Sequence, residues 1–182
     1  MAETLAGRLL VATPHLYDPN FYRTVVWIVE HNSDGAMGVV LNRPTEERLV
    51  DHVPGWAPHV AEPPVVFIGG PVSNDIAVGI ADSPSPPPES FTPTVDNIGV
   101  MDLSTDPDSL ESVRRLRVFS GYSGWTAAQL EMELASGGWF LADVEGADMF
   151  TDDPRGMWKR VLQRQPGRVA FYATFPPDPT QN

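Results

Sequence analysis

The chain has 182 residues, 42% of them hydrophobic, with no cysteine and a formal net charge of −12 at pH 7. This length predicts one domain, and the absence of cysteine excludes disulfides, thiolate nucleophiles and cysteine-bound metals. Nonspecific nucleic-acid binding depends on basic side chains that neutralise phosphates, so the acidic balance argues against nucleic acid as a partner.

Apolar runs in the first half of the chain predict short strands separated by turns. These strands are residues 7–13, 24–29, 36–41, 65–68 and 76–81. The run TVVWIV at 24–29 is continuous, which predicts burial on both faces. The polar turn that follows it predicts a hairpin with 36–41. Thr45 predicts the N-cap of a short helix over 46–53.

Prolines and capping residues divide the second half of the chain. The prolines within residues 82–94 predict an extended surface loop. Asp106 and Pro107 predict the start of a helix that ends near Val113. A last helix is predicted to begin at Asp153 and Pro154. Further strands are predicted at 98–103, 115–120, 139–143 and 169–175, and a loose tail at 176–182.

The segment RVFSGYSGWTAAQLEMEL, residues 117–134, predicts a strand, a tight glycine-rich turn and a helix. Thr126 and Gln129 have the spacing of a capping box at the start of that helix. The turn lies where a hydrolase carries its nucleophile elbow, but the G-x-S-x-G pattern is broken at Trp125 and no histidine follows Ser123. A tight turn is therefore the favoured interpretation, and a serine hydrolase stays open as the alternative.

Other polar positions allow a functional and a structural interpretation. His31 follows Glu30 at the end of a strand, where it can act as a base or a ligand, or can be a hydrogen-bonded structural residue. The pair Gly69-Gly70 follows a strand but lacks both G-x-G-x-x-G spacing and a Walker lysine, which favours a tight turn. Histidine spacing does not match a zinc site, so no metal and no cofactor is predicted.

The N-terminal region and the hydropathy pattern bear on location. Residues 1–19 carry an acidic residue before the first basic one and only a short apolar run, which is not the pattern of a signal peptide. No stretch approaches the ~18 apolar residues that a membrane-spanning helix needs. We therefore expect a cytoplasmic protein with no membrane partner.

Three segments together resemble the YqgE/AlgH family of bacterial proteins, whose biochemical function is uncharacterised. They are residues 7–44, FIGGPV at 67–72, and 117–134 with the GGWF that follows. The resemblance implies an α/β fold: a single compact domain over residues 1–175, with a strongly curved, barrel-like mixed β-sheet flanked by helices.

The matching positions are Asp18, Pro19, Phe21, Arg23, Glu30, His31, Asn32, Gly35, Met37, Gly38, Asn42, Arg43, Pro44, Gly69, Gly70, Pro71, Gly121, Tyr122, Gly124, Trp125, Gln129, Leu130 and Glu131. Two departures matter. Val29 stands where relatives often have cysteine, so a thiol-based role does not apply. Ser123 stands where alanine is common, which weakens the nucleophile interpretation.

From these residues we predict a candidate functional surface: Asp18, Arg23, Glu30, His31, Asn32, Asn42, Arg43, Tyr122, Trp125 and Glu131. The preferred hypothesis is a noncatalytic binding or regulatory module that recognises a protein or a small ligand through polar residues at turns. One alternative is a hydrolase-type enzyme that uses Glu30 and His31 as acid–base groups. Another is a transcriptional regulator, a label that some family members carry, but the sequence has no helix-turn-helix and no basic recognition helix. The oligomeric state stays open.

Overall fold

Ten strands, two short α-helices and five 3-10 helices make up the described part of the chain, residues 3–84, 89–109 and 113–177 of the computed structural model. The strands are β1 (Leu9–Ala12), β2 (Val25–Asn32), β3 (Gly35–Val40), β4 (Pro44–Arg48), β5 (Val65–Ile68), β6 (Val72–Asp82), β7 (Phe91–Val95), β8 (Ile98–Met101), β9 (Arg115–Thr126) and β10 (Trp139–Ala142). The helices are α1 (Gln129–Ala135) and α2 (Met157–Gln163), with 3-10 helices η1 (Leu49–Asp51), η2 (Pro54–His59), η3 (Pro107–Ser109), η4 (Pro154–Gly156) and η5 (Gly167–Thr174).

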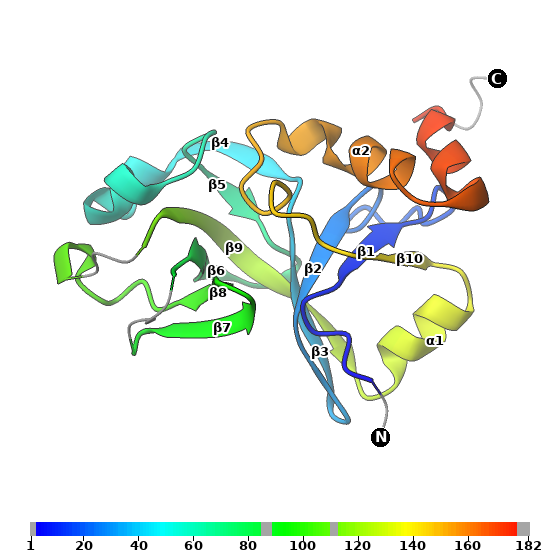
Figure 1. The fold of residues 1–182 in the computed structure, drawn as a ribbon, viewed down its shortest axis with the longest axis horizontal. Coiled ribbons are helices and arrows are strands. Elements are labelled where there is room, and N and C mark those ends of the chain that lie inside the picture. Colours follow the sequence, from blue (N-terminus) through cyan, green and yellow to red (C-terminus); the bar gives the residue numbers. More distant parts are fainter. Residues whose placement is uncertain (1–2, 85–88, 110–112, 178–182) are drawn as a thin grey trace.

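The strands form one strongly curled sheet in the order β10-β1-β2-β3-β9-β6-β8-β7, and β5 joins β9 with β4 beside it (Figure 1). The pairing of β5 with β9 is parallel, whereas the neighbours along the main path are antiparallel. The long strand β9 belongs to both halves of the sheet, because its first half pairs with β6 and its end pairs with β3. The predicted fold class is confirmed: a single domain with a curled, mixed sheet and few helices.

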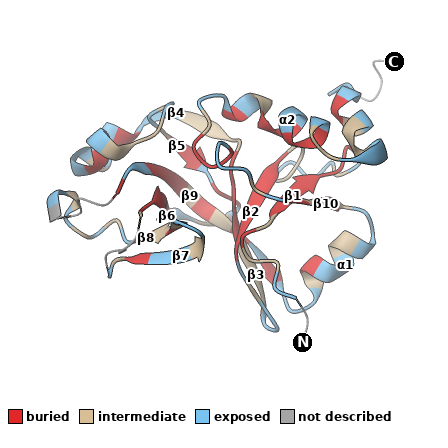
Figure 2. Ribbon diagram, in the orientation of Figure 1, coloured by how far each residue is buried: buried red, intermediate tan, exposed pale blue. Residues whose placement is uncertain are grey.

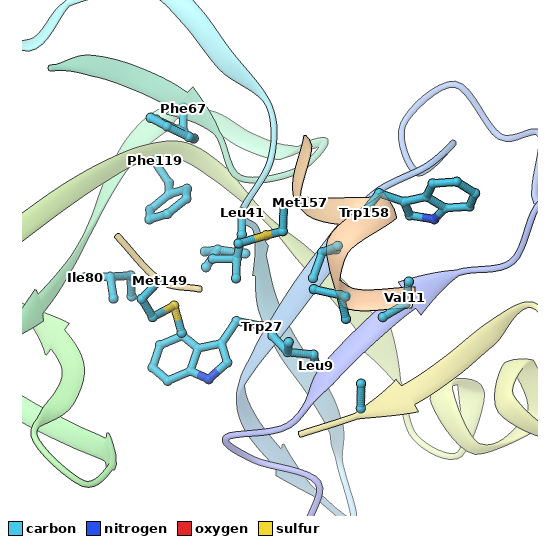
Figure 3. Packing of buried hydrophobic residues seen from close by; sticks show 14 of the residues in the cluster. Leu9, Val11, Trp27, Leu41, Phe67, Ile80, Phe119, Met149, Met157 and Trp158 are labelled. Atoms are coloured by element: carbon cyan, nitrogen blue, oxygen red, sulfur yellow. The ribbon is translucent and has the colours of Figure 1, made fainter. Parts of the chain in front are cut away.

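The strands β1 and β2 are buried on both faces, as their apolar runs predict (Figure 2). Alternate residues point to opposite sides of a strand. Leu9 and Trp27 accordingly join the core cluster that α2 covers with Met157 and Trp158 (Figure 3). Leu10, on the other face of β1, joins a separate cluster with Leu130 of α1. A third cluster lies beneath η1 and η2.

Two glycine-containing segments meet backbone to backbone where β5 runs into β6 and passes β9. A Cβ atom on Gly69 would lie 2.3 Å from the carbonyl oxygen of Gly121, and one on Gly70 would lie 2.2 Å from that of Tyr122. Gly121 has φ +70°, a left-handed conformation that glycine adopts at little cost. We call the contact of Gly69, Gly70 and Gly121 the crossing. It requires glycine at each of these positions.

The crossing corrects the interpretation of residues 121–125 as a strand-to-helix turn. β9 continues through this segment to Thr126, so the glycines lie inside a strand. Ser123 is fully buried, and its hydroxyl donates to the Gly69 carbonyl at 3.1 Å. The backbone N–H of Val40 donates to the same carbonyl at 2.8 Å. Ser123 is thus part of the crossing, and its hydroxyl is not presented to solvent.

The predicted helix over residues 46–53 is wrong. Residues 44–48 form β4, which pairs with β5, and only η1 follows. The Thr45 hydroxyl donates to the Val66 carbonyl of β5 at 2.6 Å and so does not cap a helix. This strand-to-strand pairing outweighs the local helix propensity of the segment.

The predicted strand at 169–175 is also wrong, because residues 169–174 belong to η5 and Phe175 is its C-cap. Val169 and Tyr172, three residues apart, both pack against the core cluster under α2, and Ala173 is buried beside them. That spacing places them on one face of a helix, whereas on a strand they would face opposite sides.

The proline-rich segment 82–94 is a loop only in part. β7 begins at Phe91 and contains Pro93, which the structure tolerates because β7 lies at the edge of the sheet and pairs with β8 alone. Residues 85–88 of the predicted loop, and 110–112 of the helix predicted to end near Val113, lie outside the described residues; η3 accounts for the start of that helix.

The start of α1 differs from the predicted capping box. The helix begins at Gln129, and the residue before it is Ala128 with φ +61°. Gln129 nevertheless reaches back to Thr126, where its side-chain oxygen accepts from the backbone N–H at 3.0 Å. One half of the predicted pair of contacts is therefore formed. The glycine stop after α1 is confirmed, since Gly137 has φ +81° directly beyond the helix.

Candidate functional site

Three adjoining cavities of about 210, 230 and 280 Å³ form a groove beside β4, β5 and the first half of β6. They lie side by side, because Asn74 lines all three and neighbouring cavities share further residues. We call this the β4–β6 groove. Its lining residues are Asn20, Val40, Arg43, Thr45, Glu47, Leu49, His52, Val53, Val66, Ile68, Gly70, Pro71, Asn74, Asp75, Ile76, Ala77, Val118, Phe119 and Ser120.

A bulge in β6 opens the groove. Val72 pairs with Tyr122 of β9, yet the next paired residue, Ala77, stands opposite Ser120. Residues 73–76 therefore have only Gly121 opposite them, and the surplus chain bows away from β9. The Ser120 hydroxyl donates to the Asn74 carbonyl at 2.7 Å and holds the bulge in place.

The walls of the groove are largely apolar and open to solvent. Ile68 at the end of β5 is 44% exposed, and Ile76 on the bulge is 49% exposed. Thr45 and Glu47 of β4 both line the groove, as the two-residue period of a strand requires. Exposed branched aliphatic side chains beside a concave surface are typical of a binding site.

Arg43 forms one end of the groove. Its guanidinium donates to the carbonyl oxygens of Asn20 at 2.8 Å and Tyr22 at 3.2 Å. Burial lowers the pKa of Arg43, and the charge of Asp18 acts in the opposite direction. Within the described residues no carboxylate comes within ion-pair distance of Arg43. A partly desolvated cation with carbonyl partners favours an incoming anion.

The other end of the groove is acidic. Glu47 lies 3.2 Å from His52 in an exposed pair, and Asp75 lines the same cavity. The groove therefore carries a positive group at one end and carboxylates at the other, with aliphatic side chains between them.

Asn42 and Arg23, two further residues of the predicted surface, hold the loop that precedes β2. The Asn42 side chain accepts from the N–H of Val25 at 2.9 Å and donates to the carbonyl of Arg23 at 2.9 Å. The Arg23 guanidinium lies 4.3 Å from the ring centre of Trp158 and donates to the carbonyl of Phe175. Together with Asp18 and Arg43, these residues form one group at the groove end of the β2–β3 hairpin.

His31 clasps the N-terminal segment and α1 to the far end of the same hairpin. Its Nδ1 accepts from the backbone N–H of Leu5 at 3.0 Å, so the ring proton lies on Nε2, which donates to Glu131 at 2.6 Å. The hydrogen bond from its own backbone N–H, followed by the bond from His31, lowers the pKa of Glu131. Only 8% of the His31 side chain is exposed. These contacts match the interpretation of His31 as a hydrogen-bonded structural residue.

Glu30 does not join His31 in an acid–base couple. Glu30 lines a shallow cavity of about 210 Å³ with Asn32 and Trp125, whereas the His31 ring faces Leu5 and Glu131. Adjacent strand residues point to opposite faces, which separates the two groups. The geometry that the hydrolase hypothesis requires is therefore not present.

The two aromatic residues of the predicted surface contribute mainly to packing. Trp125 is 6% exposed, and its indole N–H donates to Glu133 at 2.8 Å, as does that of Trp139. Tyr122 is partly buried and packs against the core cluster under α2. Glu133, which joins the two indoles, was not among the predicted residues.

The predicted residues thus fall into two groups at opposite ends of β2. Arg23 precedes the strand and His31 lies near its end, roughly 25 Å away at about 3.3 Å per residue. Of the predicted surface, Arg43 lines the groove. Most of the other lining residues were not predicted, namely Thr45, Glu47, His52, Ile68, Asn74, Ile76 and Ser120. β4 reads locally as a helix and the bulge in β6 has no sequence signature, so neither wall was predicted.

Within the described residues, no three His, Asp or Glu side chains lie close enough together to hold a metal ion. In the same ranges, no helix has both the length and the hydropathy needed to cross a membrane.

The whole chain is similar to curated bacterial proteins. The profile of the family described as DUF179, AlgH-like, matches residues 9–170. A UPF0301 protein from Thermobifida fusca is 44% identical over 190 residues, which cover 98% of this chain and 96% of that protein. A UPF0301 protein from Streptomyces coelicolor is 45% identical over 186 residues, covering 99% and 96%.

Two solved structures are similar in fold. The crystal structure of DIP2367 from Corynebacterium diphtheriae has a TM-score of 0.88 at 28% identity, covering 96% of this chain and 94% of that one. The solution structure of the AlgH protein from Pseudomonas aeruginosa has a TM-score of 0.71 at 28% identity, with 96% and 95% covered. The curled sheet is therefore common to all three proteins.

Proposed function

The chain belongs to the AlgH-like family, and for this member we propose a noncatalytic binding module that holds an extended segment of a protein partner in the β4–β6 groove. The observation that carries the proposal is the groove itself, three adjoining cavities with exposed Ile68 and Ile76 on their walls. An elongated groove suits an extended peptide better than a compact small molecule.

The chemistry of the lining supports a binding role. Aliphatic side chains supply apolar area, and polar groups at the middle and the ends can fix the position of a peptide backbone. In the middle of the groove, the Asn74 side chain is such a group, and the Ser120 hydroxyl, which donates to the Asn74 carbonyl, can still accept a hydrogen bond. The candidate catalytic groups do not converge on it, because Ser123 is buried at the crossing and Glu30 lies at the far end of the hairpin.

Selection from a random peptide library tests the proposal. Displayed peptides of about ten residues, which extend to roughly 33 Å, are selected on the immobilised full-length chain. Binding of the enriched peptides is then measured to the wild-type chain, to the double variant Ile68→Asp/Ile76→Asp, and to Met132→Asp. Met132 on α1 is 68% exposed and lies outside the groove, so Met132→Asp controls for a negative charge placed on an exposed apolar residue, although it adds one charge where the groove variant adds two.

The proposal predicts enriched peptides whose affinity falls at least about tenfold in the groove variant and is unchanged in Met132→Asp. Thermal unfolding of all three chains checks that each is folded. The proposal is overturned if no peptide is enriched, or if the enriched peptides bind the groove variant as tightly as the wild-type chain.

A further inference from the structure

One end of the β4–β6 groove carries a positive charge and the other end carries negative charges. This difference bears on the chemistry of the segment that the groove would bind. Arg43 lies at one end, in the cavity that Ile68 and Pro71 also line. Glu47 and Asp75 lie at the other end, in the cavity that Ile76 also lines. The middle cavity joins the two.

At the Arg43 end, the protein holds the guanidinium in one place. Two of its N–H groups donate to the carbonyls of Asn20 and Tyr22, which fixes the plane of the group. Five N–H donors are available on a guanidinium, so others stay free for a ligand carboxylate. Asp18 contributes a negative field but does not pair with Arg43.

At the acidic end, two carboxylates line the cavity with little positive charge beside them. Among the described residues, Glu47 forms its ion pair with His52, at 3.2 Å, and the side chain of His52 is 53% exposed. Asp75 lies on the exposed part of the β6 bulge. The formal charge of the whole chain is −12, so its field adds to the attraction of a cation at this end and opposes an anion everywhere except near a fixed base.

We infer that the groove binds its peptide in one direction, with a carboxylate of the peptide at Arg43, a lysine or arginine at Glu47 and Asp75, and aliphatic side chains between them. This inference rests on the proposed function, because it assigns a polarity to the segment that the groove binds. Charge complementarity along a groove fixes the register and direction of a ligand. The carboxylate comes either from an acidic side chain or from the C-terminus of the peptide.

Charge-reversal variants at the acidic end test the inference. The peptides are those whose binding Ile68→Asp/Ile76→Asp abolishes, each synthesised also with its basic residue changed to Glu. They are titrated against the wild-type chain, Glu47→Lys/Asp75→Lys, and the control Asp34→Lys/Asp108→Lys. The control makes the same change in net charge at exposed residues outside the groove.

The expected result is that Glu47→Lys/Asp75→Lys binds the original peptides about tenfold more weakly and binds the Glu-substituted peptides better than the wild-type chain does. The control variant keeps the wild-type preference. Equal weakening by both lysine variants overturns the inference, because it indicates a response to net charge alone.

The Arg43 end is tested with Arg43→Lys and Arg43→Gln. Both lose the forked geometry that contacts the loop, but only the first keeps the charge. The wild-type chain should prefer a peptide that carries the carboxylate over the same peptide without it. We expect this preference to persist in Arg43→Lys and to disappear in Arg43→Gln. Amidation of the peptide C-terminus identifies the source of the carboxylate, since it abolishes that preference only if the terminus supplies it. If neither variant alters the preference, the inference is overturned.

Failure of the inference differs from failure of the proposed function. Groove-dependent peptides without any charge pattern leave the binding module in place and remove only its polarity. If no groove-dependent peptide is obtained at all, both are lost.

Discussion

At the crossing and in the β4–β6 groove, two successive stretches of the chain meet β9 in opposite ways. At the crossing the backbones touch, and a Cβ on Gly70 would lie 2.2 Å from backbone atoms of Tyr122. Immediately beyond it, four residues of β6 bow away from the single residue Gly121, and cavities open. The crossing is closed because its glycines have no side chains. The groove is open because β6 has more residues than β9 between their paired positions.

The residues that match the family are of two kinds. Gly69, Gly70 and Gly121 act through their backbone, because any side chain there would collide with a neighbouring strand. Arg43 acts through its side chain at the end of the groove. Substitutions at the crossing should therefore affect folding first, whereas substitutions in the groove should affect binding and leave the fold intact.

The largest effect is expected for Gly70→Ala at the crossing. The new methyl group would overlap backbone atoms of β9 that cannot move without breaking the contact between β9 and the β5–β6 connection, so we expect a loss of more than about 4 kcal/mol in the free energy of unfolding. Gly146→Ala is the matched control, since a Cβ there meets nothing within 4 Å. Urea denaturation measures both. A Gly70→Ala chain as stable as Gly146→Ala contradicts the account of the crossing.

The next-largest effect on stability is expected for a substitution of Arg117, a buried residue of β9. Its side chain is 1% exposed and donates to the carbonyls of Met149, Glu62 and Thr151, at 3.2, 2.6 and 3.0 Å. Burial lowers the pKa of Arg117 to about 10, with a smaller contribution from the charge of Arg115. Arg117→Met would leave three carbonyls without their donor.

We expect Arg117→Met to lower the free energy of unfolding by about 2–4 kcal/mol. The exposed Arg155 supplies the control, because Arg155→Met should change stability by less than about 0.5 kcal/mol. Chemical denaturation of both variants measures the difference. Similar values for the two would show that the contacts of the buried arginine add little.

A smaller effect is expected at the His31 clasp, at the far end of the hairpin. His31→Ala removes the acceptor for the Leu5 N–H and the donor to Glu131, so we expect a loss of about 1 kcal/mol in stability. Peptide binding in the groove should be unchanged, because the clasp lies at the other end of β2. Loss of peptide binding together with normal stability would assign a ligand role to the hairpin end.

The clasp also predicts a pH dependence. The pKa of Glu131 is lower in the folded chain, through its own backbone N–H first and His31 second, so its contribution to stability is present above the ordinary carboxyl pKa. That contribution is lost as pH falls through the lowered folded-state value. Glu131→Gln should remove this part of the acid sensitivity, measured as the difference in denaturation midpoint between neutral and acidic pH. An unchanged pH profile contradicts the assignment.

The smallest effect on stability is expected for the groove variant Ile68→Asp/Ile76→Asp. Both side chains are nearly half exposed, so the free energy of unfolding should change by less than about 1 kcal/mol while peptide binding is lost. The measurement pairs a denaturation curve with a binding titration on the same sample. Unfolding of this variant would place these residues with the crossing, as determinants of the fold.

The sequence predicts the strands that are defined by their own apolar runs. β1, β2, β3 and β5 were predicted from such runs, and the crossing partners Gly69, Gly70 and Gly121 appeared in the motifs without their contact. β4 was missed because its residues favour a helix in isolation and become a strand only by pairing with β5. η5 was missed because residues 169–175 are a short apolar run rich in aromatic residues, a composition that strands also favour.

The candidate site was predictable only in part. Arg43 emerged from the family pattern, but the groove depends on a bulge whose register is set by Ser120 and Asn74, far apart in the sequence. The polar residues in the first part of β6 are typical of a turn, so the sequence predicted a connection between strands there. His31 and Glu131 were selected because they are polar and match the family, and the structure gives them a bonded partner in each other.

The most direct test of the central claim is to map a bound peptide by NMR. A groove-dependent peptide is titrated into the isotope-labelled chain, and backbone amide shifts are followed. We expect the largest changes at Arg43, Thr45, Ile68, Ile76 and Ser120, which line the β4–β6 groove. Changes concentrated at Glu30, Asn32 and the rest of the β2–β3 hairpin tip, with the groove unaffected, would contradict the claim.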